Sequence, residues 1–320
     1  MRQKTATIQV NRSHLAIICL QNGNFYAIIV KYNGPTMTQT NAQWTKVITA
    51  KRRLMDLHLR DVWTYRYLIK MFIKRDFVTQ YKQTILGPLW YLAQPLITAF
   101  MYMFIFGKMA KVGTDGVPFV LFYFAGTMLW TYFTSCLDSC SKTFTTNQNI
   151  FGKVYFPRLT SPIATCGFHV IKLLMQFVLL AAIFLYTVFV QKQRIQISWW
   201  AFSFPLIVLW VGVLGGSLGL IISSLTTKYR DLNILLTFGI QLGMYATPVV
   251  YPLSELPQKF SWLAYANPMC APIEFFRIAF YGAGHLDASV IICSVATTFA
   301  LAFFGLVLFT RNERNFVDVI

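Results

Sequence analysis

Polar and aromatic side chains recur at helical spacing along three apolar stretches of this sequence. Hydroxyl, amide and phenol groups on one helix face can hydrogen-bond to the edges of sugars, and aromatic rings can stack on the apolar faces of sugar rings. We therefore predict a carbohydrate channel lined by Tyr91, Gln94, Thr98 and Tyr102, by Tyr123, Thr127 and Trp130, and by Gln241 and Tyr245. Helix–helix packing and aromatic belts at the membrane surface explain the same residues equally simply, and the sequence leaves these alternatives open.

Signatures of bond-making chemistry are missing. The sequence has no G-x-x-x-x-G-K-[ST] motif, so we do not expect the chain to bind ATP through a phosphate loop of its own. Its four histidines are scattered, its six cysteines lack metal-ligand spacing, and neither H-E-x-x-H nor a nucleophile elbow occurs. We expect no catalytic residue, metal or cofactor in this chain, so a separate subunit must supply any energy.

Ionisable residues are sparse within the apolar stretches, whereas ion-coupled carriers generally need buried carboxylates or lysines along the ion path. Asp138 and Lys172 lie near the expected ends of two spans, where they can pair with each other or extend to the membrane surface. Glu274 and Arg277 have the spacing of a local i, i+3 ion pair. These groups favour structural roles over proton or ion transport.

Composition indicates the elements that must position these side chains. The chain has 320 residues, of which 56% are hydrophobic and 12% charged, whereas about a quarter of the residues in a soluble domain are charged. The apolar residues gather in windows of about 20, which is long enough to cross about 30 Å of hydrocarbon. We predict an all-α integral membrane protein with six transmembrane helices near 85–106, 117–137, 166–190, 199–223, 233–251 and 288–309.

The net charge of +17 lies mainly outside these windows, and about half of the basic residues precede Gln83. Lys and Arg collect in the cytoplasmic segments of membrane proteins, so the pattern places both termini in the cytoplasm of a multi-pass protein. Lipid headgroups and a cytoplasmic partner account for the charge better than nucleic acid does.

A basic amphipathic helix is predicted from Arg60 to Gln83, and its aromatic and charged faces suit the membrane interface. Between Tyr251 and Asp287, four prolines divide an apolar stretch into two short helices, about 254–265 and 268–281. Each is too short to span, so we predict two re-entrant helices that form an external lid.

The N-terminal residues differ from the rest. LAIICLQNGNFYAIIVKY predicts a β-hairpin around Asn22-Gly23, and Met37 is an equally good starting point for the native chain. The predicted parts are an N-terminal extension (1–36), a cytoplasmic segment with the interface helix (37–84), a six-span domain (85–310) and a cytoplasmic tail (311–320).

Several sequence blocks resemble the permeases of ABC type-2 transporters, in the order that the family has them. RDFVTQYKQTILGPLWYLAQPL is similar to the entry into the family's first span, and NIFGKVYFPRLTSPIA to its loop between the second and third spans. KYRDL resembles its fourth loop, and QLGMYATPVVYPLSELP with NPMCAPIEFFR its fifth span and external gate helices. Within the family, the blocks look most like exporters of lipid-linked polysaccharides such as O-antigen, capsule and teichoic acid.

The resemblance implies a homodimer in the bacterial inner membrane, bound to two cytoplasmic ATPase subunits that hold ATP and magnesium. It assigns coupling with the ATPase to Arg75, Asp76, Lys153, Tyr155, Phe156, Pro157, Arg158, Tyr229, Arg230 and Asp231. It assigns the external gate to Pro248, Tyr251, Pro252 and Pro268, with Glu274 and Arg277 on the second gate helix.

The predicted function is therefore that of a permease subunit that exports a lipid-linked glycan through a channel along the dimer axis. One alternative keeps the fold and exchanges the cargo for a drug-like or lipid molecule. Another is a membrane-embedded transferase or an ion-coupled carrier, which would need clustered Asp, Glu or His at membrane depth.

Overall fold

The chain divides into two compact units, Met1–Asp56 and Leu57–Ile320. The computed structural model describes residues 5–9, 14–21, 24–31, 47–49, 59–82, 87–147, 150, 156–193, 195–226, 229 and 231–315.

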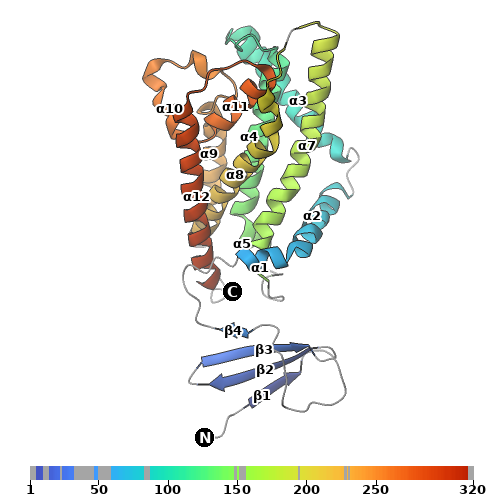
Figure 1. The fold of residues 1–320 in the computed structure, drawn as a ribbon, viewed down its shortest axis with the longest axis vertical. Helices are drawn as coiled ribbons and strands as arrows, with labels where there is room; N and C mark the ends of the chain where they lie inside the picture. The colour runs from blue at the N-terminus through green and yellow to red at the C-terminus, as the bar shows by residue number, and fades with distance from the viewer. Residues whose placement is uncertain are drawn as a thin grey trace. The chain divides into compact units, whose positions relative to one another are not determined.

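The first unit contains an antiparallel sheet with the strand order β1-β2-β3-β4 (Figure 1). Its strands are β1 (Thr5–Gln9), β2 (His14–Gln21), β3 (Asn24–Lys31) and β4 (Val47–Thr49). Because β2 pairs with β3 up to Gln21 opposite Asn24, the predicted hairpin is confirmed. β4 pairs with β3, so this unit extends past residue 36, where the sequence suggested a boundary.

The regular secondary structure of the second unit is helical in all of its described residues, which confirms the all-α prediction for the membrane part. Its helices are α1 (Leu59–Thr64), α2 (Arg66–Tyr81), α3 (Trp90–Tyr102), α4 (Phe119–Ser141), α5 (Thr143–Thr146), α7 (Thr160–Phe189), α8 (Phe204–Thr226), α9 (Leu232–Tyr245), α10 (Trp262–Ala266), α11 (Cys270–Tyr281) and α12 (Ala288–Asn315). Figure 1 shows α2, α5 and the end of α12 at one end of this unit, which we call the α2 end. It shows α10 and α11 at the opposite end, which we call the α11 end.

Five of the described helical segments are long and apolar enough to cross a membrane: Leu92–Met109, Phe119–Ser141, Thr160–Phe189, Trp199–Thr226 and Ala288–Arg311. The first continues from α3 into a π-helix (Met103–Met109). The remaining predicted span, 233–251, is occupied by α9, which has 14 residues and is therefore about 21 Å long. The helix gives way to turns after Tyr245, so a sixth complete span stays a prediction.

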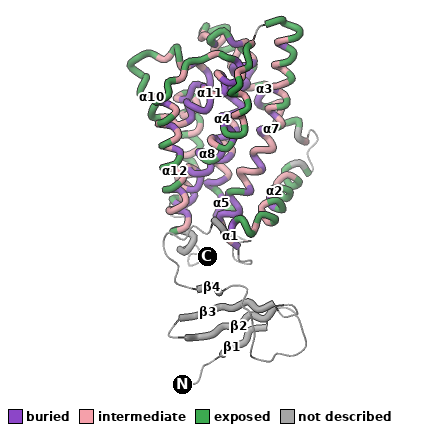
Figure 2. The backbone as a smooth tube through the Cα atoms, viewed as in Figure 1, coloured by how far each residue is buried: buried purple, intermediate pink, exposed green. Residues whose placement is uncertain are grey.

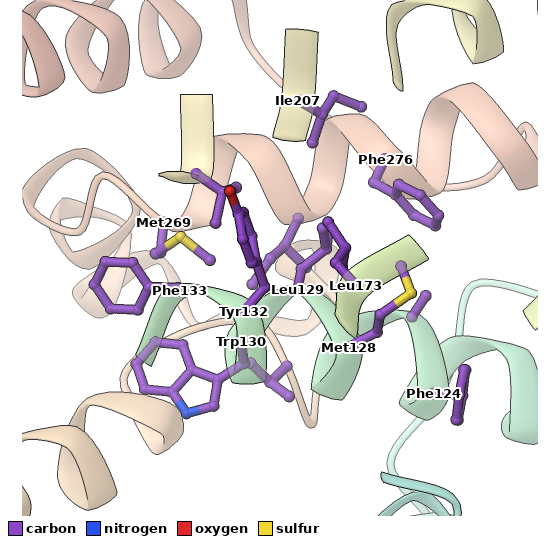
Figure 3. Packing of buried hydrophobic residues seen from close by; sticks show 14 of the residues in the cluster. Phe124, Met128, Leu129, Trp130, Tyr132, Phe133, Leu173, Ile207, Met269 and Phe276 are labelled. Atoms are coloured by element: carbon purple, nitrogen blue, oxygen red, sulfur yellow. The ribbon is translucent and has the colours of Figure 1, made fainter. Parts of the chain in front are cut away.

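Helix α4 lies at the centre of the second unit. It packs against α3, α7, α8, α9 and α11, and residues 121–130 are all buried, as the purple tube in Figure 2 shows. Glycines on α8 permit the close approach: a Cβ atom on Gly215 would lie 2.7 Å from the carbonyl oxygen of Phe133. Small residues at helix contacts allow backbones to pack closely. Figure 3 shows the resulting core, in which α4 side chains meet residues of α7, α8 and α11.

The stretch between α9 and α12 differs from the prediction in its first half. Residues 254–265 do not form one helix; they contain two short 3₁₀ helices, Leu253–Glu255 and Gln258–Phe260, and then α10. Pro257 explains the break, because proline lacks an N–H group and disfavours helical backbone in the residue before it. The second predicted helix is present as α11, which ends at Gly282 in a left-handed conformation with φ of 65°.

Candidate functional site

The predicted interface helix is present as α1 and α2, which are separated at Tyr65. Helix α2 packs against α7 at the α2 end (Figure 1). The side chains of Arg66, Lys70 and Lys74 are exposed, whereas Phe72 on the other face is buried. The charged and apolar faces of the helix therefore lie where the sequence pattern predicts.

Two segments that the family resemblance assigns to coupling meet beside α7. The rings of Phe72 and Phe156 lie edge to face with their centroids 5.7 Å apart. Both are buried in one apolar cluster with Ala164 of α7. Phe156 therefore fixes the loop after α5 to α2 within the same chain, and its ring is not available to a partner protein.

Of the other predicted coupling residues, Pro157 and Arg158 are half-buried next to Phe156, and Tyr229 and Asp231 are exposed before α9. Lys153, Tyr155 and Arg230 lie outside the described residues.

A polar cavity of about 610 Å³ lies between α2, α4, α5 and α7. Arg75 and Asp76, two of the predicted coupling residues, line it and form an ion pair at 2.8 Å. The Arg75 guanidinium also lies 4.6 Å from the centre of the Phe72 ring. Across the cavity, Asp138 pairs with Lys142 at 2.7 Å. This ion pair gives Asp138 a structural role at the end of α4.

The predicted channel residues on α4 lie in the protein core. Tyr123, Thr127 and Trp130 are 0%, 4% and 9% exposed. The Thr127 hydroxyl donates a hydrogen bond to the Tyr123 carbonyl within the same helix, at 2.8 Å. Within this chain, the polar stripe of α4 serves helix packing, the alternative that the sequence left open.

The predicted channel residues on α3 and α9 are placed differently. Gln94, Gln241 and Tyr245 are exposed, and Thr98 is half-buried. The Tyr102 hydroxyl donates to the Met244 sulfur at 3.1 Å, which joins α3 to α9. The side chain of Tyr91 lies outside the described part of the chain.

We call the exposed faces of these two helices the α3–α9 edge. No described residue of α9 is buried. Around the polar residues the edge exposes large apolar side chains, namely Ile97, Phe100, Met101, Phe104, Ile234, Leu235, Phe238 and Leu242. A glutamine amide finds no hydrogen-bond partner in hydrocarbon, so an edge that mixes amides with apolar groups suits a protein neighbour or a water-filled path better than lipid alone.

The predicted ion pair on α11 is confirmed, with Arg277 Nη1 3.1 Å from Glu274 Oε2. Both residues are almost completely buried, at 1% and 0% exposure. Burial raises the pKa of the Glu274 carboxyl, and the positive charge of Arg277 opposes this shift.

Contacts that the sequence did not reveal tie this ion pair to other elements. Arg277 Nη2 donates to the Val249 carbonyl at 3.2 Å, and the guanidinium lies 3.6 Å from the centre of the Phe122 ring on α4. The hydroxyl of Tyr281 donates to the Leu121 carbonyl at 3.3 Å. Pairs so distant along the chain leave no local sequence signal. The contacts of Arg277 and Tyr281 make α11 part of the core.

The remaining predicted gate residues surround the turn after α9. Pro248 and Pro252 are buried, and Tyr251 and Pro268 are half-buried. Asn267 braces this turn, since its side-chain NH₂ group donates to the Thr247 hydroxyl at 2.7 Å. A gate at the α11 end stays a prediction, and any such motion must accommodate an α11 that is packed on several sides.

The comparisons with known proteins bear on this arrangement. A family described as ABC-2 type transporter matches residues 67–281, which is more than half of the chain. The chain belongs to the ABC-2 type transporter family. The match begins in α2 and runs to the end of α11, so nearly all of α2, the α3–α9 edge and the Glu274–Arg277 pair lie within the family region of this ABC-2 type transporter, whereas α1 precedes it.

Individual relatives agree with this placement. The chain is 28% identical over 256 residues to the O-antigen export system permease protein RfbA of Klebsiella pneumoniae, covering 79% of this chain and 95% of the relative. It is 24% identical over 264 residues to the protein of the same name from Myxococcus xanthus, covering 82% and 98%. As an ABC-2 type transporter, the chain is a multi-pass membrane component of a transport system and not an enzyme.

A second polar cavity of this ABC-2 type transporter, about 330 Å³ in volume, lies between α3, α4 and α7. From α7 it receives His169, Lys172 and Gln176, which share one helix face because they are three and four residues apart. No function was predicted for this face from the sequence. Its i, i+3, i+7 run of polar residues in an apolar helix was the signal that could have revealed it.

Proposed function

We propose that this ABC-2 type transporter is the permease subunit of an ATP-driven exporter of a lipid-linked polysaccharide in the bacterial inner membrane. The relatives from Klebsiella pneumoniae and Myxococcus xanthus are permease proteins of O-antigen export systems, which supports a polysaccharide cargo. The basic N-terminal half of the chain supports an orientation in which the α2 end and both termini face the cytoplasm.

In this proposal two copies of the chain meet along the α3–α9 edge, and the glycan passes between them. One observation supports the proposed channel: Gln94, Gln241 and Tyr245 are exposed on helices that are otherwise apolar on their outer faces. Water or sugar hydroxyls in a channel would satisfy the amides, and the tyrosine ring offers a stacking surface. Tyr123, Thr127 and Trp130 then support the channel from behind as core residues.

Two ATPase subunits, with bound ATP and magnesium, supply the energy at the α2 end. Helix α2 and the loop held by Phe156 form one packed element there, so a push on either segment moves both. Since α2 packs along α7, which crosses the unit, the displacement can reach the α3–α9 edge.

A cargo of lipid or drug-like character is the second candidate, and one observation favours it. A groove of about 660 Å³ between α7, α8 and α12 has an almost entirely apolar lining that includes Ile163, Val170, Leu209 and Ala302. Acyl chains of the bilayer fit such a groove equally well. In addition, a lipid or drug-like cargo leaves the polar groups of the α3–α9 edge without a role.

Co-expression with candidate ATPase subunits tests the proposal. We expect glycan to reach the cell surface only when the chain and an ATPase with an intact phosphate-binding lysine are both present. Export of a lipid or drug without any glycan would favour the second candidate. Transport by the chain without an ATPase would contradict the proposal.

A further inference from the structure

The cavity between α3, α4 and α7, which we call the His169–Lys172 pocket, combines a positive charge with neutral polar groups. Among the residues that the structure describes, its walls contain one lysine and no carboxylate: they are Gln94, Pro95, Thr98, Thr131, Tyr132, Thr134, Ser135, His169, Lys172, Leu173 and Gln176. A cavity of about 330 Å³ can hold a group of phosphate size with water around it. The composition of the walls favours an anion.

Lys172 lies deep within its helix. Helix α7 begins at Thr160, so Lys172 follows 12 residues later (172 − 160), about 18 Å along the axis. The sequence placed it near the end of a span because the helix was expected to begin at 166. The Lys172 ammonium lies 4.4 Å from the centre of the Phe168 ring. Ionisable residues within transmembrane helices usually face a cavity and have a function.

His169 provides a second and independent observation. It is 6% exposed, and its Nε2 atom is 2.9 Å from the hydroxyl of Ser139. Its Nδ1 atom is buried and has no hydrogen-bond partner among the described residues. When the Ser139 hydroxyl donates to Nε2, the ring proton resides on Nδ1 and lacks an acceptor. A buried donor without an acceptor is unfavourable, so a ligand that accepts this hydrogen bond would complete the site.

The pocket also has an approach from the α2 end. His169 lines both this pocket and the cavity of about 610 Å³ beside α2, so the two cavities adjoin at its side chain. Arg75 and Lys142, together with their acidic partners, lie along the outer cavity. An anionic group entering beside α2 would pass these charges before it reached Lys172.

We propose that the His169–Lys172 pocket binds the phosphate group that joins the lipid to the glycan. Lys172 supplies the charge, as a lysine ammonium commonly does for phosphate, and His169 supplies a hydrogen bond. The inference rests on the proposed function, in which the lipid-linked cargo carries such a phosphate. A neutral sugar would not require a lysine in the wall of the pocket.

Binding to the full-length chain in maltoside micelles tests the site. The probes are a polyprenyl diphosphate, the polyprenol without phosphate and phosphatidylglycerol, with the Kd of each measured by native mass spectrometry. We expect the diphosphate to bind most tightly. Lys172→Gln should raise the Kd for the diphosphate at least about tenfold, because it removes a charge-assisted hydrogen bond. Lys172→Arg should retain most of the affinity. Lys192→Gln, at an exposed lysine beyond the end of α7, should match the wild type.

Three outcomes would overturn the proposal. The first is an unchanged Kd for the diphosphate in Lys172→Gln. The second is a polyprenol that binds as tightly as its diphosphate. The third is phosphatidylglycerol that binds as tightly as the diphosphate, because this result would assign the site to membrane lipid. If Lys172→Gln does not fold, His169→Gln replaces it, with a loss of affinity expected and an unchanged Kd again contradictory. Export by the wild-type chain with its ATPase is measured separately, so failure of the proposed function is distinguishable from failure of this site.

Discussion

At the residue scale, the Glu274–Arg277 pair determines how the α11 end is built. A single guanidinium contacts the carboxylate of Glu274, the carbonyl of Val249 and the ring of Phe122, so it joins α11, the turn after α9 and α4. Removal of one partner of a buried ion pair leaves the other buried and uncompensated. The pair therefore controls the position of α11 more than its local i, i+3 spacing suggests.

We expect Arg277→Met to lower the free energy of unfolding by about 3–5 kcal/mol, because it leaves the Glu274 carboxylate buried alone. Thermal unfolding of the purified protein in micelles measures the effect. Lys142→Met is the matched control, since it breaks an exposed ion pair with Asp138 and should change stability by less than about 1 kcal/mol. Equal losses in the two variants would show that burial of the pair is unimportant.

At the scale of elements, the contact between α4 and α8 holds the membrane unit together. The glycines of α8 face α4 so closely that a Cβ on Gly219 would lie 2.7 Å from the Leu137 carbonyl oxygen. Lipid supplies no hydrophobic drive for helix association, so packing at such small residues must supply it.

Gly215→Ala tests this contact, because its methyl group would lie 2.7 Å from the Phe133 carbonyl oxygen. We expect a loss of about 1–3 kcal/mol from overpacking. Gly239→Ala on α9 is the control: no atom lies within 4 Å of its added methyl group, so the better helix propensity of alanine should leave stability unchanged or raised. Thermal unfolding of both variants measures the difference, and a stabilised Gly215→Ala variant would contradict the packing argument.

The attachment of α2 is the second decisive element contact. Phe72→Ala removes the ring that contacts Phe156, which we expect to destabilise the α2 region by about 3–5 kcal/mol. Amide hydrogen exchange in α2 should accelerate, and glycan export should fall at an unchanged amount of protein in the membrane. Tyr67→Ala is the matched control on the same helix, because Tyr67 is 70% exposed. Unchanged exchange in Phe72→Ala would mean that α2 is held by other contacts.

At the scale of the whole molecule, the α3–α9 edge connects structure to transport. Helix α4 is surrounded by other helices, whereas α3 and α9 retain open faces that carry both amide and large apolar side chains. A second copy that covers the apolar groups and leaves the amides facing a shared path would satisfy both kinds of side chain.

Cross-linking tests this arrangement. With a bifunctional thiol reagent in membranes, we expect Gln241→Cys to give covalent dimers. When the protein is first dissociated in denaturant and then treated with the reagent, no covalent dimers should form. Phe299→Cys is the control, since Phe299 is 72% exposed on α12, which is not one of the two helices of the edge. The unmodified chain corrects for the native cysteines. Dimers formed through Phe299→Cys and not through Gln241→Cys would place the interface elsewhere.

Features that depend on local pattern could be predicted before the structure was known. Apolar windows specify the membrane class and the positions of the long helices, Asn22-Gly23 marks the hairpin, and the spacing of Glu274 and Arg277 produces their ion pair. Only the tertiary structure decided which side of each helix is covered. Tyr123 and Gln94 both stand within apolar stretches of the sequence, yet Tyr123 lies in the core and Gln94 is exposed. His169 and Lys172 likewise gain a pocket only because α3 and α4 close around α7. The physical reason is that periodicity defines a helix face, whereas packing between segments distant in the chain determines what that face contacts.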